Sequence, residues 1–335
     1  MMKALILTDD RAHPLQLRDV ATPVPAPGQV RLRVRAAALN RRDYYISRGQ
    51  YAAIRYNSIQ GSDVCGIVDA LGSDADAAWL GKRVVIDPGF NWGDTERCQG
   101  SDYGITGMQR DGSFAEYMLA DVGSLYSAPE HLDDAEAAAL PLAGVTAFRA
   151  LFSRGQLAEG ESVLVSGTGG GVAQFVLQFA VAHGARTYVT SGTEEKIERA
   201  MASGAAGGVL YHADNWSAEL RGLSGGIDLA VDGAGGNGID GILRSLNPGG
   251  RLVLYGSTLG RPEGLDTHRI FWRQLNIMGS TMGSPRDFAA MIEFVQHHKI
   301  KPVIDSVRPL TSILEAYERM RTNAQFGKLA IRIED

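Results

Sequence analysis

The feature that most constrains this 335-residue chain is a glycine-rich segment, Ser166-Gly167-Thr168-Gly169-Gly170-Gly171-Val172-Ala173. It comes directly after the apolar run 163–165 and opens a second apolar run with helical character. Glycines permit a tight turn and a close approach of phosphate groups, and a helix N-terminus offers free N–H groups and a positive dipole end. The context predicts a loop that binds the pyrophosphate of a dinucleotide, through residues 167–172; a plain glycine-rich turn is the alternative.

Strand-like and helix-like segments alternate around this loop. We expect strands at 162–166, 186–190, 208–211, 227–232 and 251–256, with 276–279 as a candidate sixth, and helices at 172–183, 194–203, 215–221 and 239–246. Such alternation is typical of βαβ units that build a doubly wound parallel sheet. The remaining C-terminal part predicts helices at 286–298 and 311–321 and a last strand at 328–333.

The first 125 residues have a different pattern. Short strand-like runs at 4–7, 30–36, 64–70, 84–86 and 113–119 are separated by proline and glycine turns, which favours a barrel or sandwich. A long polar stretch at 89–111 predicts a functional or mobile loop. An alanine-rich helix is expected at 133–150. The chain is therefore predicted to be an α/β protein with one β-rich part and one parallel-sheet part.

Composition excludes several classes of protein. Lys plus Arg is 33 and Asp plus Glu is 38. The resulting net charge of −5 does not indicate the basic surface that binds nucleic acid. The two cysteines, Cys65 and Cys98, are too few for a disulfide framework or a four-thiolate zinc site. The longest apolar stretch, 137–148, is shorter than the about 20 residues that span a membrane. With no signal peptide visible, we expect a cytoplasmic protein without nucleic-acid or membrane partners.

The end of the second expected strand of the parallel sheet bears on the choice of cofactor. An NAD site usually has an acid there, whereas this chain has Ser191. Ser191 can donate a hydrogen bond to a 2′-phosphate, Lys196 can supply charge, and Tyr211 can cover the adenine, which favours NADPH. Alternatively, Ser191 and Glu194 form a capping box and Lys196 is a solvated helix residue. Glu194 and Glu195 leave NADH open.

Two further turns are candidates for the cofactor site. Gly233 follows the fourth expected strand of the parallel sheet and Gly256 follows the fifth. Parallel sheets bind ligands beyond the carboxyl ends of their strands, so both glycines are predicted to line the cofactor. Ordinary loop chemistry is the alternative interpretation.

Three further motifs carry a resemblance to a known family. The segment Leu140-Pro141-Leu142-Ala143-Gly144-Val145-Thr146-Ala147, followed by the glycine-rich loop, resembles the medium-chain dehydrogenase/reductase superfamily over nearly the whole chain. Two further segments resemble its quinone oxidoreductase branch: Asn40-Arg41-Arg42-Asp43-Tyr44-Tyr45-Ile46-Ser47-Arg48-Gly49-Gln50-Tyr51 and Gly61-Ser62-Asp63-Val64-Cys65-Gly66-Ile67-Val68. The resemblance implies a GroES-like catalytic domain (residues 1–125 and 267–335) around a Rossmann domain (126–266). It also implies homodimers, often formed by edge-to-edge pairing of the Rossmann sheets.

The resemblance implies positions for a metal and for the nicotinamide. The Cys, His and Cys that ligate zinc in related alcohol dehydrogenases match Asn40, Ser62 and Leu142 here, and the acid after the His position is Asp63. Amide, hydroxyl and leucine side chains do not suit zinc, so we expect no catalytic metal. The resemblance places Thr146 beside the nicotinamide and Lys328 where the family closes over the cofactor.

Without a metal, hydride transfer to an electron-poor acceptor is the expected reaction. The acceptor would be a quinone or an activated alkene such as an enone or enoyl thioester, with Asn40, Tyr44 and Tyr51 donating hydrogen bonds to its oxygen. A tyrosine or solvent could supply the proton. Alternatively, Asn40 and Asp43 form a local turn, and the tyrosines pack at the domain interface. The arginines at 41, 42 and 48 could be solvated charges.

Two other functions stay open from the sequence. One is an alcohol dehydrogenase-like enzyme, and the other is an NADPH-binding protein without turnover. The aromatic residues and methionine at 90, 92, 271, 272 and 282 either line an apolar pocket or anchor their loops. The identity of the substrate is not encoded in any motif found here.

Overall fold

The computed structural model describes residues 1–73 and 77–333, which form two compact units. Unit 1 comprises Met1–Ala143 and Ser284–Asp335, and unit 2 comprises Gly144–Gly283. The two boundaries between the units, after Ala143 and after Gly283, lie further along the chain than the expected boundaries at 125/126 and 266/267. Helix α2 (Asp134–Ala139) packs on strands of unit 1, and β16 (Asn276–Gly279) joins the sheet of unit 2. Residues 334 and 335 of the expected terminal segment lie outside the described residues.

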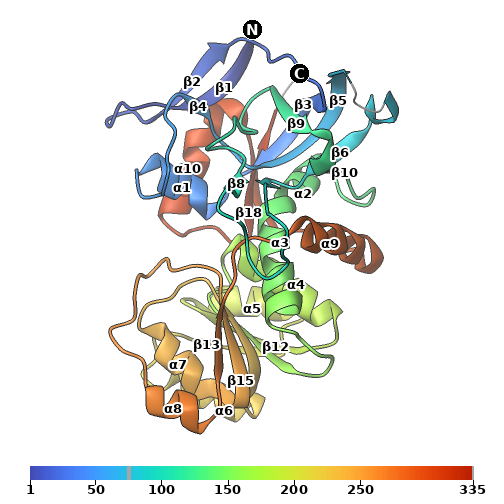
Figure 1. Cartoon of the computed structure of the whole chain (residues 1–335). Helices are drawn as coiled ribbons and strands as arrows, with labels where there is room; N and C mark the ends of the chain where they lie inside the picture. The colour runs from blue at the N-terminus through green and yellow to red at the C-terminus, as the bar shows by residue number, and fades with distance from the viewer. Residues whose placement is uncertain (74–76, 334–335) are drawn as a thin grey trace. The chain divides into compact units, whose positions relative to one another are not determined.

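Unit 2 is built on a six-stranded parallel sheet (Figure 1). Its strand order is β13-β12-β11-β14-β15-β16, and every neighbouring pair is parallel. The order reverses between β11 and β14, which is the topological switch point where such sheets bind ligands. This confirms the expected Rossmann-type sheet. The other strands are β11 (Ser162–Val165), β12 (Arg186–Ser191), β13 (Gly207–Leu210), β14 (Ile227–Asp232) and β15 (Leu246–Leu254).

The helices of unit 2 connect these strands as the sequence predicts. Left-handed glycines end two of them: Gly184 (φ +85°) follows α4, and Gly225 (φ +76°) is the C-cap of α6. The expected helix at 133–150 is interrupted, because α2 ends at Ala139 with Leu140 as its C-cap, and Pro141 begins α3. The helices are α3 (Pro141–Phe148), the π-helical η3 (Arg149–Arg154), α4 (Gly171–Ala182), α5 (Glu194–Ala202), α6 (Trp216–Ser224), α7 (Gly238–Ser245) and α8 (Thr267–Trp272).

Unit 1 contains the expected β-rich part and both ends of the chain. Strand β18 (Lys328–Arg332) pairs antiparallel with β3 (Gln29–Ala38), with Ala330 opposite Ala38. The main sheet has the order β10-β6-β5-β3-β18-β17, and β9 also pairs with β3. Its other strands are β5 (Asp63–Leu71), β6 (Arg83–Ile86), β9 (Tyr117–Asp121), β10 (Leu125–Ser127) and β17 (Ile304–Pro309).

Smaller elements complete unit 1. A three-stranded sheet has the order β2-β1-β4, and β7 pairs with β8 inside the long polar stretch. These strands are β1 (Met2–Leu7), β2 (Leu15–Val20), β4 (Ser58–Ile59), β7 (Gly89–Phe90) and β8 (Gly104–Ile105). The helices are α1 (Arg41–Ser47), α9 (Pro285–His298), α10 (Ile313–Arg321) and the 3-10 turns η1 (Ala77–Trp79), η2 (Val122–Ser124) and η4 (Leu310–Ser312).

The core of unit 1 follows from alternation and helical periodicity. Inward positions of β3 are buried and outward ones half-exposed over most of its length, as a strand with one covered face requires. Helix α10 contributes Ile313, Ala316, Tyr317 and Met320, which share one face, to the same apolar cluster. Sequence reasoning missed β2 and β17 because their mixed, partly exposed residues lack a clean period-2 pattern.

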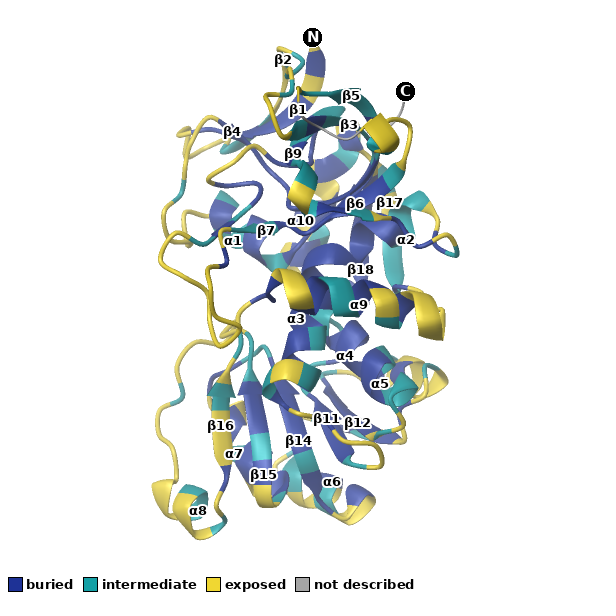
Figure 2. Cartoon of the chain, turned by 45° about the vertical axis from the view of Figure 1, so that its right-hand side comes forward, coloured by how far each residue is buried: buried dark blue, intermediate teal, exposed yellow. Residues whose placement is uncertain are grey.

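Burial differs across unit 2. Figure 2 shows the central strands β11 and β14 as buried, whereas β16 and α8 are largely exposed. Central parallel strands are covered on both faces by helices, which explains their continuous apolar sequences. Over residues 1–73 and 77–333, no helix is both long and apolar enough to cross a membrane.

Candidate functional site

The glycine-rich loop connects β11 to α4 in unit 2. Gly167 adopts φ +69°, a conformation that other L-residues rarely take, whereas Gly170 has φ −81° and ψ 154° as the N-cap of α4. A Cβ atom added at either glycine would meet no atom within 4 Å apart from those of the residues next to it in the chain. The protein's own packing therefore does not require glycine at 170, and the loop leaves open space of the kind that a bound phosphate needs.

Hydrogen bonds from the two flanking strands fix the loop. The Gly167 N–H donates to Thr190 Oγ1 at 3.1 Å, and the Thr168 N–H donates to the Thr190 carbonyl at 3.0 Å. The Ser166 hydroxyl donates to Asp232 at the end of β14. Thr168 is fully buried, and its Oγ1 accepts from Gln174 at 3.1 Å. The loop is thus held rigidly at the switch point, and the buried Thr168 side chain serves the loop's own structure.

The two glycines at the ends of β14 and β15 are needed for packing. A Cβ atom at Gly233 would lie 2.4 Å from the Tyr255 ring, and one at Gly256 would lie 2.7 Å from the Gly233 carbonyl oxygen. Burial also raises the pKa of the Tyr255 hydroxyl. Packing alone therefore explains why both positions are glycine, and the contact of Gly233 and Gly256 with the cofactor stays a prediction.

The end of β12 carries Ser191, the residue predicted to contact the 2′-phosphate. Ser191 is buried, and its Oγ accepts from the Thr193 N–H at 3.3 Å, which leaves the hydroxyl hydrogen available. Thr193, and not Ser191, is the N-cap of α5, because its Oγ1 accepts from the Lys196 N–H at 3.4 Å. Tyr211 is half-exposed, and its hydroxyl lies 2.6 Å from the position of a Cβ atom on Gly192. The capping box with Glu194 is not formed.

In unit 1, Asn40 lies between β3 and α1. Its backbone N–H donates to the Asp43 carboxylate at 2.8 Å, so Asp43 caps the helix as the alternative interpretation predicted. Asp43 is completely buried, and this burial raises its pKa to about 6 although the Arg42 guanidinium opposes the shift. The local turn fixes the backbone at Asn40, and its side chain points elsewhere.

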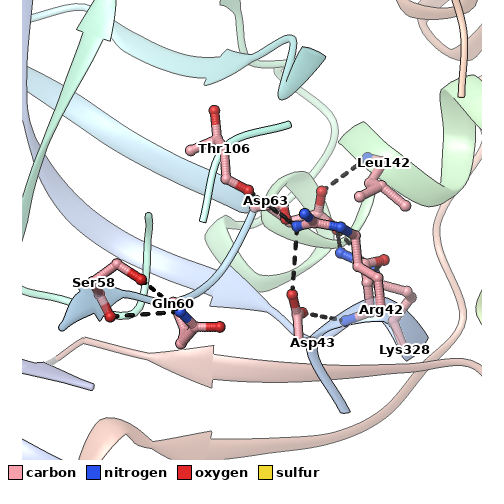
Figure 3. Close-up of polar contacts among 10 residues, drawn as sticks. Arg42, Asp43, Ser58, Gln60, Asp63, Thr106, Leu142 and Lys328 are labelled. Atoms are coloured by element: carbon pink, nitrogen blue, oxygen red, sulfur yellow. Dashed lines mark hydrogen bonds and ion pairs between the residues drawn. The ribbon is translucent and has the colours of Figure 1, made fainter. Parts of the chain in front are cut away.

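The Asn40 side chain joins a buried set of polar groups around Asp63, drawn in part in Figure 3. We call Asn40, Asp63, Lys328 and the Leu142 N–H the Asp63 cluster. One carboxylate oxygen of Asp63 accepts from Asn40 Nδ2 at 2.9 Å and from Lys328 Nζ at 2.8 Å, and the other accepts from the Leu142 N–H at 2.8 Å. Lys328 Nζ also donates to Asn40 Oδ1 at 2.7 Å. The exposed fractions of Asn40, Asp63 and Lys328 are 6%, 0% and 4%.

Arg42 is a buried residue of this region that sequence reasoning treated as a solvated charge. Its Nη1 donates to Ser62 Oγ at 2.6 Å and to the Thr106 carbonyl at 3.0 Å, and its guanidinium lies 5.4 Å from the Tyr51 ring centroid. Among the described residues, Arg42 Nε and Nη2 find no hydrogen-bond partner. A buried arginine needs acceptors that are distant in sequence, so only the fold could reveal them.

The structure places the two predicted tyrosines differently. Tyr51 is partly exposed and connects to Ser62 through Arg42. Tyr44 is half-buried and packs against the apolar core of unit 1, with its ring centroid 5.9 Å from that of Tyr45. Tyr51 is thus the tyrosine that the structure links to the residues next to Asp63.

The aromatic residues of the loops divide into anchors and lining residues. Trp92 is buried, and its Nε1 donates to the Thr95 carbonyl at 2.9 Å, so it anchors its loop. Phe90 lines a cavity of 610 Å³ within unit 1, together with Asp87, whose pKa burial raises to about 7. Asn40, Tyr44 and Tyr51 do not line this cavity. The exposed large apolar side chains of α8 are Phe271 and Trp272.

The predicted nicotinamide contact Thr146 belongs to unit 2. It lies in α3 and is buried, and its hydroxyl donates to the Met282 sulfur at 3.8 Å. Met282 is buried as well and adopts φ +46°.

Comparison with known proteins bears on the whole chain. Residues 26–130 match the family described as alcohol dehydrogenase GroES-like domain, and residues 171–297 match the family described as zinc-binding dehydrogenase. A zinc-type alcohol dehydrogenase-like protein, YogA, from Leptosphaeria maculans is 38% identical and covers 96% of this chain and 95% of its own length. The quinone oxidoreductase of Homo sapiens is 31% identical over 91% of this chain and 89% of its own. An acryloyl-coenzyme A reductase from Sulfurisphaera tokodaii is 28% identical over 99% and 100%.

Solved structures agree with this placement. A crystal structure of an NAD-dependent alcohol dehydrogenase superimposes with a TM-score of 0.93 at 34% identity, covering all of both chains. The crotonyl-CoA carboxylase/reductase AntE in complex with NADP has a TM-score of 0.89 over 99% of this chain and 94% of its own. At 22% identity, the second similarity shows the fold alone.

The residues at the zinc-matched positions do not fit a zinc ion. The Asn40 amide is bonded to a carboxylate and an ammonium, Ser62 accepts from a guanidinium, and Leu142 contributes only a backbone N–H. Zinc binds thiolate, imidazole or carboxylate ligands, and two fixed cations beside it would oppose its binding. Within the part of the chain that the structure describes, no three His, Cys, Asp or Glu side chains gather as a metal site.

Proposed function

Since this chain belongs to the medium-chain dehydrogenase/reductase superfamily, we propose that it is an NADPH-dependent oxidoreductase that passes hydride to a quinone or an activated alkene without a catalytic metal. The observation that carries the proposal is the Asp63 cluster, in which the Asn40 amide, at a position matched to a zinc ligand of related enzymes, is bonded to the Lys328 ammonium and to Asp63. Electron-poor acceptors need less polarisation than a simple ketone, so hydrogen-bond donors suffice for them.

Unit 2 supports the cofactor part of the proposal. The N-terminus of α4 faces open space at Gly170, so its free N–H groups and dipole can bind the pyrophosphate. Ser191 and Lys196 would hold the 2′-phosphate, Tyr211 would cover the adenine, and no acid at the end of β12 repels that phosphate. The proposed cofactor-binding residues are Thr146, Gly167, Thr168, Gly169, Gly170, Gly171, Val172, Ser191, Lys196, Tyr211, Gly233 and Gly256.

The bound nicotinamide would supply the hydride, and the residues of unit 1 would bind the acceptor oxygen. Asn40 keeps one Nδ2 hydrogen beyond the one given to Asp63, and Tyr51, whose ring centroid lies 5.4 Å from the Arg42 guanidinium, has a hydroxyl to donate. As hydride adds to the acceptor, negative charge develops on its oxygen, and these donors stabilise that charge. Water or a tyrosine hydroxyl then supplies the proton that completes the two-electron reduction. Tyr44 is the less favoured donor because its ring packs on the core.

A panel of acceptors tests the proposal. Purified protein is mixed with NADPH or NADH and with quinones, enones, enoyl thioesters, aldehydes or simple ketones, and separately with NADP+ or NAD+ and alcohols. Turnover is read at the absorbance band of the reduced cofactor. We expect reduction of quinones or activated alkenes and none of simple ketones. NADPH binding without turnover for any acceptor would point to the binding-protein alternative. Alcohol oxidation with stoichiometric zinc would point to the dehydrogenase alternative.

The outer edge of unit 2 supports a homodimer as the working form. Strand β16 ends the sheet, Ile277 on it is partly exposed, and the neighbouring α8 exposes Phe271 and Trp272. An unpaired strand beside apolar side chains is a template for pairing with a second copy. We expect Ile277→Lys to shift the mass measured by light scattering from dimer to monomer. A monomeric wild type, or a variant that stays dimeric, would contradict this surface as the interface.

A further inference from the structure

Lys328 connects two parts of unit 1 that are far apart in sequence. It is the first residue of β18, 288 positions from Asn40, and its ammonium contacts both Asn40 Oδ1 (2.7 Å) and Asp63 Oδ2 (2.8 Å). An ammonium only donates hydrogen bonds and an ionised carboxylate only accepts them. The oxygen of the Asn40 amide must therefore face Lys328, and its nitrogen must face Asp63.

This pair of contacts selects one orientation of an otherwise symmetric side chain. Each of the two amide orientations fills nearly the same space, so packing cannot choose between them. With Lys328 and Asp63 in place, the inverted amide would put a donor against an ammonium and an acceptor against a carboxylate. Low exposure of all three side chains keeps water from screening this choice.

We propose that Lys328 is a positioning residue of the reaction site, and that its ammonium fixes the Asn40 amide so that the second Nδ2 hydrogen is presented to the acceptor oxygen. The proposal rests on the proposed function and deepens it. It moves Lys328 from the cofactor-binding residues, where the family resemblance puts it, to the acceptor side. In place of a metal, the chain's own cation organises the neutral donor that stabilises the developing charge.

A purely structural role for Lys328 is the competing explanation. In that case the ammonium only neutralises the buried Asp63, and losing either charge alone is what harms the protein. The two explanations predict different orders for two variants. Lys328→Gln keeps a donor toward Asn40 and Asp63 but leaves Asp63 without a counter-charge. The double variant K328M/D63N removes both charges. It thereby removes the ammonium and the carboxylate that orient the Asn40 amide.

The experiment measures kcat with the best acceptor, the dissociation constant for NADPH, and the unfolding midpoint for the wild type and both variants. We expect kcat to fall about 10-fold in K328Q and about 100-fold in K328M/D63N, because one oxyanion donor is lost in the latter. We expect the unfolding midpoint to follow the opposite order, with K328Q less stable than the double variant. The NADPH dissociation constant should stay within about 3-fold of wild type in both.

Three results would overturn the proposal. A K328M/D63N variant with wild-type kcat would show that Lys328 only balances charge. A large rise in the NADPH dissociation constant with unchanged kcat would return Lys328 to the cofactor site. A wild type that reduces no acceptor would sink this proposal together with the proposed function, whereas the first two results leave the proposed function intact.

A double-mutant cycle covers the case in which K328M/D63N does not fold. K328Q is then compared in the wild-type background and in the N40A background. If Lys328 acts through Asn40, the 10-fold loss of kcat caused by K328Q should vanish when Asn40 is already absent. An equal loss in both backgrounds would contradict the proposal.

Discussion

The glycine-rich loop of unit 2 and the Asp63 cluster of unit 1 are two different ways to build a site for charge. The loop is one continuous segment whose backbone N–H groups and helix dipole face open space. The cluster is made of side chains and one N–H from four separate segments, and its side chains are at most 6% exposed. A backbone site tolerates changes of side chain that leave its space free, whereas a buried side-chain cluster depends on every partner.

The difference has an energetic side as well. The backbone dipoles of the loop carry no ionisable group, so pH does not change them. The cluster and its neighbours bury two cations, Lys328 and Arg42, next to two carboxylates, Asp43 and Asp63. Removing one of these four charged side chains leaves a buried charge unpaired, which lowers the free energy of unfolding by about 3–5 kcal/mol. The three predictions that follow test this contrast in order of decreasing effect.

The largest effect is expected at Gly170. Its φ and ψ suit valine, and no atom beyond the adjacent residues lies within 4 Å of the added Cβ, so Gly170→Val should fold normally. The new side chain would fill the space that the pyrophosphate needs, and the NADPH dissociation constant should rise on the order of 1,000-fold. Titration of NADPH fluorescence measures it. Gly264→Val, also in open space within unit 2, is the control; equal affinities for both variants would refute the phosphate loop.

A smaller effect, on stability, is expected at Asp43. Its folded-state pKa of about 6 lies above the ordinary aspartate value of 3.8, so its contribution to stability is present at low pH and lost as pH rises through about 4 to 6. Relative to Asp43→Asn, the wild type should lose about 3 kcal/mol of unfolding free energy over that range. Urea unfolding between pH 4 and pH 8 measures it.

The control for Asp43 is a partly exposed ion pair. Asp69 lies 2.9 Å from Arg31 with both side chains about one quarter exposed. Asp69→Asn should change the unfolding free energy by no more than about 1 kcal/mol. Parallel pH curves for the wild type and Asp43→Asn would mean that Asp43 is not a perturbed buried carboxyl.

The smallest of the three effects concerns the choice between NADPH and NADH. Lys196→Glu replaces a cation by an anion near the proposed 2′-phosphate and should weaken NADPH about 30-fold while leaving NADH nearly unchanged. Arg199→Glu makes the same charge change one turn further along α5 and serves as the control. Equal weakening of both cofactors by Lys196→Glu would refute the assignment of Lys196 to the phosphate.

The two sites also differ in how far the sequence predicted them. The loop, its preceding strand and its following helix are contiguous, so residues 162–183 contained everything needed to predict them. Asn40, Ser62, Leu142 and Asp63 were identified through the family resemblance, but their partners were not. Arg42 was expected to be solvated and is buried, because its acceptors on Ser62 and Thr106 lie 20 and 64 positions away.

By itself, the sequence determined the parallel sheet with its phosphate loop, the β-rich second part, and the absence of metal-ligating side chains at the three matched positions. The first two follow from local periodicity and glycine spacing, and the third follows from the family resemblance together with residue chemistry. Only the tertiary structure decided that β18 returns to pair with β3 and carries Lys328 to Asn40 and Asp63. The reason is physical: hydrogen bonds between side chains 265 and 288 positions apart leave no periodic trace in the chain, and their partners are set by how the strands pack.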